Sequence, residues 1–142
     1  MVTAKQVFDM AIHLMDEQNE KTGSTKTVDT DEYRFRTLSI LNTAIPYLYT
    51  YSSGADPAEA GRPEVPCLIA DDYANPDLEQ EIPLDDTLSM SCLPYYLAAN
   101  LLSGENESLS AWFLNRYRET MLDVRDRIPR QWEKITTPYG LF

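Results

Sequence analysis

The sequence predicts a mainly α-helical fold: a four-helix bundle with an inserted extended or β-hairpin segment and an extended C-terminal tail. Four stretches carry apolar residues at helical spacing, and a proline-rich segment separates the second stretch from the third. The chain has 142 residues, of which 43% are hydrophobic, which suits one core. We therefore expect a single helical domain over residues 1–142, with the insertion at 52–84 and the tail at 129–142.

The first helix is predicted over residues 3–22, with Thr3 as its N-cap and Gly23 as its stop. The second helix is predicted to start near Asp29, which precedes Glu32 by three residues in a capping-box arrangement. Pro46 is expected to kink or end this helix. The apolar residues that define the two helical faces are Val7, Met10, Ala11 and Leu14 in the first helix and Leu38, Leu41, Ile45 and Leu48 in the second.

The third helix is predicted from Asp85 or Asp86 to Ser103, with a left-handed stop at Gly104. Pro94 either bends this helix or lies in the first turn of a helix capped at Ser91.

The fourth helix is predicted over residues 106–128, with Asn106 as its cap. Trp112, Phe113 and Tyr117 recur at helical spacing and are expected in the core. Tyr95 and Tyr96 are adjacent, so on a helix they point about 100° apart, and at least one of them is expected to leave the core.

The insertion contains the strand-like runs "VPCLIA" and "LEQEIPL". They predict either a short β-hairpin or two extended arms, and the proline inside each run is typical of edges and loops. An insertion of this length is usually functional or disordered.

Charge is distributed unevenly along a chain whose net charge is −11. Residues 51–108 carry 1 basic and 12 acidic side chains, whereas residues 109–142 carry 6 basic and 4 acidic ones. A general nucleic-acid binder needs a basic face, so the composition argues against that class. One end of the chain could attract the middle of another copy; the alternative is a solvated acidic loop region that aids solubility.

No catalytic motif stands out, so we expect no enzyme activity and no cofactor. His13 is the only histidine and is expected at the surface or its boundary. Cys67 and Cys92 lack metal-ligand spacing and are expected to be reduced thiols. Paired acids such as Asp71 and Asp72 leave a metal-assisted hydrolase as the weakest alternative. No apolar run approaches about 18 residues and no signal core is present, so membrane spanning and secretion are not expected.

The helical pair "LPYYLAANLLSGENESLSAWFLNRYRETM" resembles the head–tail connector, or adaptor, proteins of tailed bacteriophages and prophages. The resemblance rests on the "LPYYLAANLL" helix, the "GEN" turn and the "SLSAWF" start of the next helix. The opening "TAKQVFDMAIHLMDE" supports it. The resemblance covers residues 3–50 and 84–128, and the acidic insertion matches least.

The resemblance implies a structural protein of the virion neck, made in the cytoplasm of the bacterial host. Such proteins form a homo-oligomeric ring, commonly of twelve copies, beneath the portal protein. The ring extends the channel through which DNA passes and attaches tail or stopper proteins. The alternative, from the residues alone, is a small intracellular regulatory module that binds a partner helix through the same aromatic hairpin.

Two sets of residues are predicted to make contacts. The apolar end of the tail either folds back onto its own domain or docks on another subunit or the portal. The predicted partner-binding residues are Trp132, Tyr139, Leu141, Phe142 and Tyr95. The predicted channel or interface acids are Asp71, Asp72, Asp77, Glu79 and Glu81.

Overall fold

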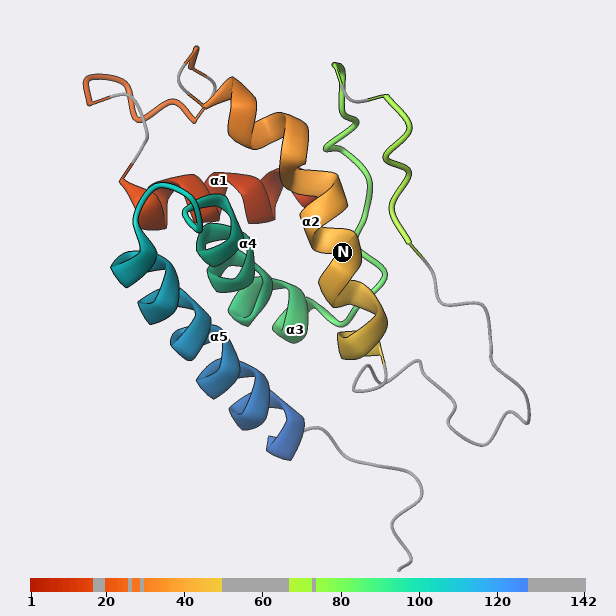
Figure 1. Cartoon of the computed structure of the whole chain (residues 1–142). Coiled ribbons are helices and arrows are strands. Elements are labelled where there is room, and N and C mark those ends of the chain that lie inside the picture. Colours follow the sequence, from red (N-terminus) through yellow and green to blue (C-terminus); the bar gives the residue numbers. More distant parts are fainter. Residues whose placement is uncertain (17–19, 26, 29, 50–66, 73, 128–142) are drawn as a thin grey trace, which may run out of the picture.

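The computed structural model describes residues 1–16, 20–25, 27–28, 30–49, 67–72 and 74–127, with side chains up to 124. The helices, shown in Figure 1, are α1 (Ala4–Met15), α2 (Asp31–Tyr49), α3 (Asp86–Ser91), α4 (Leu93–Leu101) and α5 (Glu107–Arg127). Helices α3 and α4 together form the predicted third helix, interrupted at Cys92. The prediction of a mainly α fold with four packed helices is therefore confirmed.

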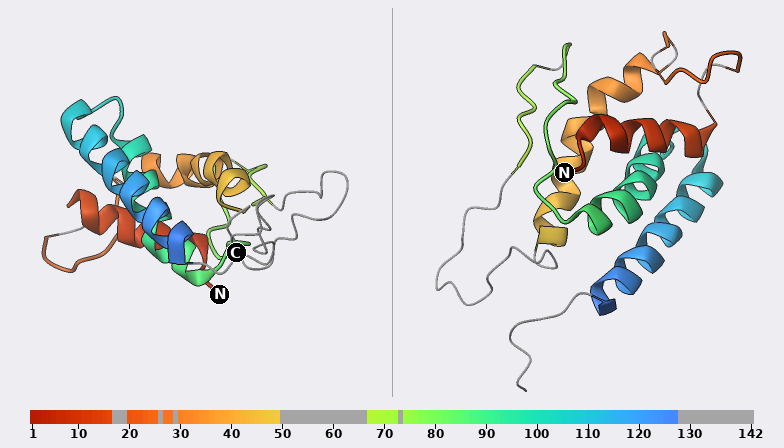
Figure 2. Two further views of the ribbon diagram at one scale, coloured as in Figure 1. Left: turned by 90° about the horizontal axis from the view of Figure 1, so that it is seen from below. Right: turned by 180° about the vertical axis from the view of Figure 1, so that it is seen from behind.

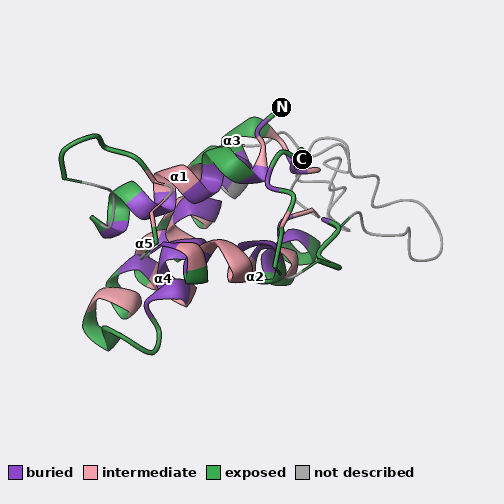
Figure 3. Cartoon of the chain, turned by 90° about the horizontal axis from the view of Figure 1, so that it is seen from above, coloured by how far each residue is buried: buried purple, intermediate pink, exposed green. Residues whose placement is uncertain are grey.

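Helix α4 lies at the centre of the bundle and packs against α1, α2 and α5. Its sequence, LPYYLAANL, is apolar around most of its circumference, which is typical of a helix enclosed by others. Ala98 and Ala99 are buried and small, so neighbouring helices can approach closely. The buried positions gather where α1, α2 and α4 meet (Figure 3).

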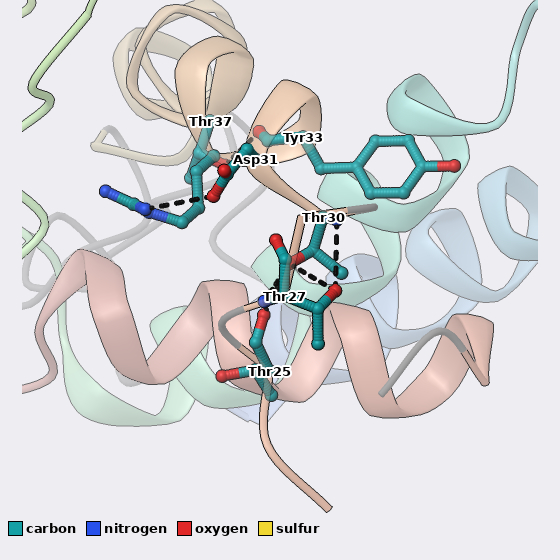
Figure 4. A network of polar contacts seen from close by, with 7 residues as sticks. Thr25, Thr27, Thr30, Asp31, Tyr33 and Thr37 are labelled. Atoms are coloured by element: carbon teal, nitrogen blue, oxygen red, sulfur yellow. Dashed lines mark hydrogen bonds and ion pairs between the residues drawn. The ribbon is translucent and has the colours of Figure 1, made fainter. Parts of the chain in front are cut away.

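Threonine side chains fix the connection from α1 to α2 (Figure 4). The Thr25 hydroxyl donates to the carboxylate of Asp9 on α1 at 2.6 Å. The fully buried Thr30 hydroxyl donates to the Thr25 carbonyl at 2.7 Å and accepts the Thr27 N–H at 2.9 Å. The loop therefore meets the start of α2 with its buried polar groups satisfied.

Helix α1 is shorter than predicted. It ends at Met15, where the apolar face ends, and Asp16 adopts the left-handed conformation with φ of 59°. The Asp16 N–H bonds to the carbonyls of Ile12 and His13 and closes the last turn. Gly23 also has positive φ, but it lies in the loop, so the predicted end at residues 22–23 is wrong.

Helix α2 differs from its prediction at both ends. Its first helical hydrogen bond runs from the Arg34 N–H to the Thr30 carbonyl at 3.0 Å, so the capping position is one residue after the predicted Asp29. Asp29 itself lies outside the described residues. Pro46 does not end the helix, which continues to Tyr49 with Pro46 exposed inside it. Packing of Ile45 and Leu48 into the core outweighs the hydrogen bond that a proline removes.

Pro94 lies in the first turn of α4, as one of the two alternatives predicted, but the preceding cap is Cys92 and not Ser91. Helix α4 ends at Leu101, and the cap Leu102 has right-handed α geometry. The predicted left-handed stop at Gly104 is therefore wrong, because the chain turns before reaching it. Asn106 accepts the Leu109 N–H at 3.1 Å, which confirms it as the cap of α5.

The described part of the insertion contains extended segments and no strand, so of the two alternatives it fits the extended arms and not the β-hairpin. We call residues 67–72 and 74–85 the arm; residues 52–66 lie outside the described part. The backbone of the arm pairs with the N-terminus of α1. The bonds run from Ala4 N–H to the Gln80 carbonyl at 2.9 Å, from Lys5 N–H to Leu78 at 2.7 Å, and from Ile82 N–H to Val2 at 2.8 Å.

These bonds complete the cap of α1. Thr3 and Gln6 form a capping box, in which each side chain accepts the other's backbone N–H at 3.3 and 2.9 Å. Together with the two arm carbonyls, they satisfy the N–H groups that a helix leaves free in its first turn.

Candidate functional site

The arm is fastened to the bundle by buried aliphatic side chains. Acidic side chains of the same segment lie exposed, so the arm has a buried apolar side and an outer side that is largely acidic. The buried residues are Leu68, Leu78, Ile82 and Leu84.

Two carboxamide side chains clasp the arm's backbone at consecutive residues. The Asn42 side chain, on α2, accepts the Leu68 N–H at 2.8 Å and donates to the Leu68 carbonyl at 2.9 Å. The Gln80 side chain accepts the Ile69 N–H at 2.7 Å and donates to the Ile69 carbonyl at 2.8 Å. In an extended chain, neighbouring peptide groups point to opposite edges, so the two clasps hold the segment from both edges.

The five predicted acids all lie exposed on the arm: Asp71, Asp72, Asp77, Glu79 and Glu81. Two of them shape the local backbone, since Asp72 accepts the Asn75 N–H at 3.2 Å and Asp77 accepts the Glu79 N–H at 3.1 Å. Within the described part of the chain, none of the five forms an ion pair with a lysine or arginine. The outer side of the arm is therefore a solvent-exposed acidic surface.

No group of three or more His, Cys, Asp or Glu side chains comes together as metal ligands among the described residues. His13 lies exposed in the last turn of α1, with Nε2 3.3 Å from the Gly23 carbonyl oxygen. Cys67 is exposed on the arm, whereas Cys92 is buried at the junction of α3 and α4. Burial raises the pKa of the Cys92 thiol to about 11, although a hydrogen bond with Thr120 lowers it.

A cavity of about 350 Å³ opens between α1, the start of α2 and the arm. Lys5 and Arg34 face three acids there, and Phe8 and Leu78 supply apolar walls. The acids are Asp9, Asp77 and Glu79. The mixed charges of this cavity favour no single class of ligand.

The helical hairpin formed by α4 and α5 is held rigidly to the rest of the bundle. The Tyr33 hydroxyl on α2 donates to the Glu105 carboxylate in the turn at 2.6 Å. Arg36 on α2 donates to the Leu101 carbonyl at 3.2 Å, and Ser110 on α5 donates to the Ala99 carbonyl on α4 at 2.6 Å.

This hairpin presents a second exposed surface, which we call the aromatic patch: Tyr95, Trp112 and Arg116. Trp112 is 53% exposed, so its predicted place in the core is wrong, whereas Phe113 and Tyr117 are buried as predicted. Trp112 and Phe113 are adjacent on a helix, so only one of them can face the core. The same rule predicted that Tyr95 or Tyr96 leaves the core. Applied to Trp112 and Phe113, it would have predicted that one of these two side chains is exposed.

The patch is built on Phe113. The Trp112 ring meets Phe113 edge-on with centroids 5.2 Å apart, and the Tyr95 ring lies 6.3 Å from Phe113. The Arg116 guanidinium lies over the half-buried Tyr95 ring, 5.6 Å from its centroid, and pairs with Glu119 at 2.9 Å. Hydrogen bonds with Tyr95 and then with Glu119 raise the pKa of Arg116, so it stays charged at any working pH.

The predicted tail anchors Trp132, Tyr139, Leu141 and Phe142 lie outside the described residues. The structure therefore brings the five acids together on one arm, whereas Tyr95 lies on α4. Among the described residues, no helix is both long enough and apolar enough to cross a membrane.

The arm and the α4–α5 hairpin that carries the aromatic patch are formed by different parts of the bundle. Figures 1 and 2 show the arm beside α2 and the N-terminus of α1, with α5 on the far side of α4. Comparison of the chain with protein-family models, with curated proteins and with solved structures found no match.

Proposed function

We propose that this chain is a structural head–tail connector, or adaptor, of a tailed bacteriophage or prophage. Copies of it form a ring, commonly of twelve in such assemblies, beneath the portal protein in the neck of the virion. The ring extends the DNA channel and attaches tail or stopper proteins. The chain's work is mechanical, with no catalytic step and no cofactor.

The observation that supports the proposal is a pair of distinct exposed surfaces, the acidic arm and the aromatic patch of the α4–α5 hairpin, on one helical body. A ring requires head-to-tail contacts, in which one face of a subunit meets a different face of its neighbour. The resemblance of residues 93–121 to connector sequences supports the same function, and in this chain those residues form the α4–α5 hairpin.

The acidic arm suits a channel through which DNA passes without being bound. Affinity for DNA comes largely from lysine and arginine contacts to phosphates. The arm has six acidic residues between 67 and 85 and no basic one. Such a surface repels phosphate at short range, so DNA moves past it without being retained.

The proposed anchor to the portal or to a neighbouring subunit is the apolar end of the tail. Its four large side chains, Trp132, Tyr139, Leu141 and Phe142, are of the kind that dominates binding energy at protein interfaces.

The test measures particle mass by mass photometry for the chain alone and mixed with the purified portal ring encoded beside it. The full chain is expected to add a stoichiometric ring to the portal. Deletion of residues 130–142 is expected to abolish that addition. The matched control, Thr136→Ala with Thr137→Ala, leaves the aromatic anchors in place and should bind like the full chain.

Two outcomes would contradict the proposal in different ways. If the full chain adds no mass to the portal and instead forms a one-to-one complex with a host protein, the regulatory-module alternative is correct. If the truncated chain still forms the ring, the anchor is wrong but the connector function stands.

A further inference from the structure

We infer that the aromatic patch of one copy binds the arm of a second copy, with Ile69 packed on Trp112 and the Asp71–Asp72 pair facing Arg116. This inference deepens the proposed function and rests on it, because it names the two surfaces through which neighbouring subunits of the ring would meet.

The aromatic patch has the composition of a binding hot spot. Tryptophan, tyrosine and arginine are the residue types that most often dominate interface energies. Here they form one contiguous surface on a rigid hairpin, supported from below by buried Phe113. Trp112 leaves about half its surface in water, which a partner's apolar side chain would cover.

The arm carries an exposed apolar side chain followed by two carboxylates, which match the tryptophan and the arginine of the aromatic patch. Ile69 is 66% exposed, although its backbone is held on both polar groups by Gln80. An exposed β-branched side chain on a fixed backbone loses little conformational entropy when it is buried. Asp71 and Asp72 follow two and three residues later, roughly 7–10 Å along an extended chain.

Charge complementarity selects a second copy as the partner. Arg116 is permanently charged, and its guanidinium has five N–H donors, more than its contacts with Glu119 and Tyr95 require. Among the described residues, no lysine or arginine forms an ion pair with Asp71 or Asp72. The arm lies beside α2, whereas the patch belongs to the α4–α5 hairpin, so the contact joins two different surfaces and can repeat head-to-tail around a ring.

The native chain is already suited to the experiment that tests this contact. A nitroxide label placed on exposed Cys67 lies two residues from Ile69, whereas Cys92 is buried and its thiol stays protonated near neutral pH. Spin-labelled chain at natural isotope abundance is mixed with ¹⁵N-labelled chain at high concentration. Signal loss in the ¹⁵N spectrum then reports only contacts between copies, including weak ones.

The expected result is a signal loss centred on the Trp112 indole N–H and the backbone amides of residues 112–116, at least twofold relative to the reduced label. Asp71→Lys with Asp72→Lys should remove this loss. The matched control, Glu20→Lys with Glu32→Lys, makes the same change in net charge at exposed acids outside the arm and should retain it. Trp112→Ala should also remove it, and its exposed position lets the fold persist.

A uniform signal loss, or one centred on another element, would overturn the inference. So would a loss that both charge-reversed pairs reduce equally, because that would show a general effect of net charge. If the contact is absent but the portal still acquires its ring, the inference fails and the proposed function stands. If the contact is present but no ring forms on the portal, the proposed function fails and the contact stands as a feature of the chain.

Discussion

Replacement of Asn42 by alanine should release one edge of the arm. The Asn42 side chain makes two hydrogen bonds to the backbone of Leu68, at 2.8 and 2.9 Å, and Leu68 itself is buried. Each bond contributes about 1 kcal/mol net, and a buried peptide group left without partners costs further free energy. We therefore expect Asn42→Ala to lower the free energy of local opening at Leu68 by about 2–3 kcal/mol.

Amide hydrogen exchange measured by NMR gives this quantity residue by residue. A loss of 2–3 kcal/mol corresponds to exchange at the Leu68 amide that is roughly 30- to 150-fold faster, since about 1.4 kcal/mol is a factor of ten. The Ile69 amide, which donates to Gln80, should accelerate by less than about tenfold. Gln80→Ala should reverse that order between the two amides.

Ser39→Ala is the matched control, because Ser39 is an exposed polar residue about one turn before Asn42 on α2. It should leave exchange at Leu68 unchanged. If Asn42→Ala changes exchange at Leu68 by less than about threefold, the carboxamide does not hold the arm and the reasoning is refuted.

Three further substitutions test the core, the cap and the buried thiol. Leu97→Ala in the fully buried centre of α4 should lower the free energy of unfolding by about 3–5 kcal/mol in urea, and an unchanged midpoint would contradict the central place of α4. Thr3→Ala should cost about 1 kcal/mol by thermal melting, and Thr3→Ser should recover most of it; equal losses in both variants would rule out the cap. Burial raises the pKa of Cys92 from 9.0 to about 11, so the fold favours the neutral thiol and loses stability as pH rises from 9 to 11. Cys92→Ala should show a decline smaller by about 2–3 kcal/mol over that range, and identical pH profiles would contradict the assignment.

The helices could be predicted from the sequence because their apolar faces repeat over several turns. Val7, Ala11, Leu41 and Ile45 are buried where their spacing places them. The ends were harder to predict, since Asp16 and Leu102 stop their helices without a glycine. At these points tertiary packing decides where the helix ends, and single-residue preferences are too weak to show it.

The arm shows a different limit of sequence reasoning. Its strand-like runs were recognised, but their partners were not, because Asn42 and Gln80 bond through side chains and the N-terminus of α1 bonds across a long stretch of chain. Local patterns carry no record of such long-range partners. The five acids lie exposed, as expected of a segment dense in carboxylates, and their role at a channel or interface stays a prediction.

The cap of α1 has a consequence for how the protein is made. Two N–H groups of its first turn bond to the carbonyls of Leu78 and Gln80, more than seventy residues further along the chain. A ribosome releases the N-terminus first, so α1 emerges long before the residues that complete it. During synthesis α1 must therefore wait with an incomplete N-terminal cap until residues 78–80 have been translated, and over that interval it is open to proteases and premature association.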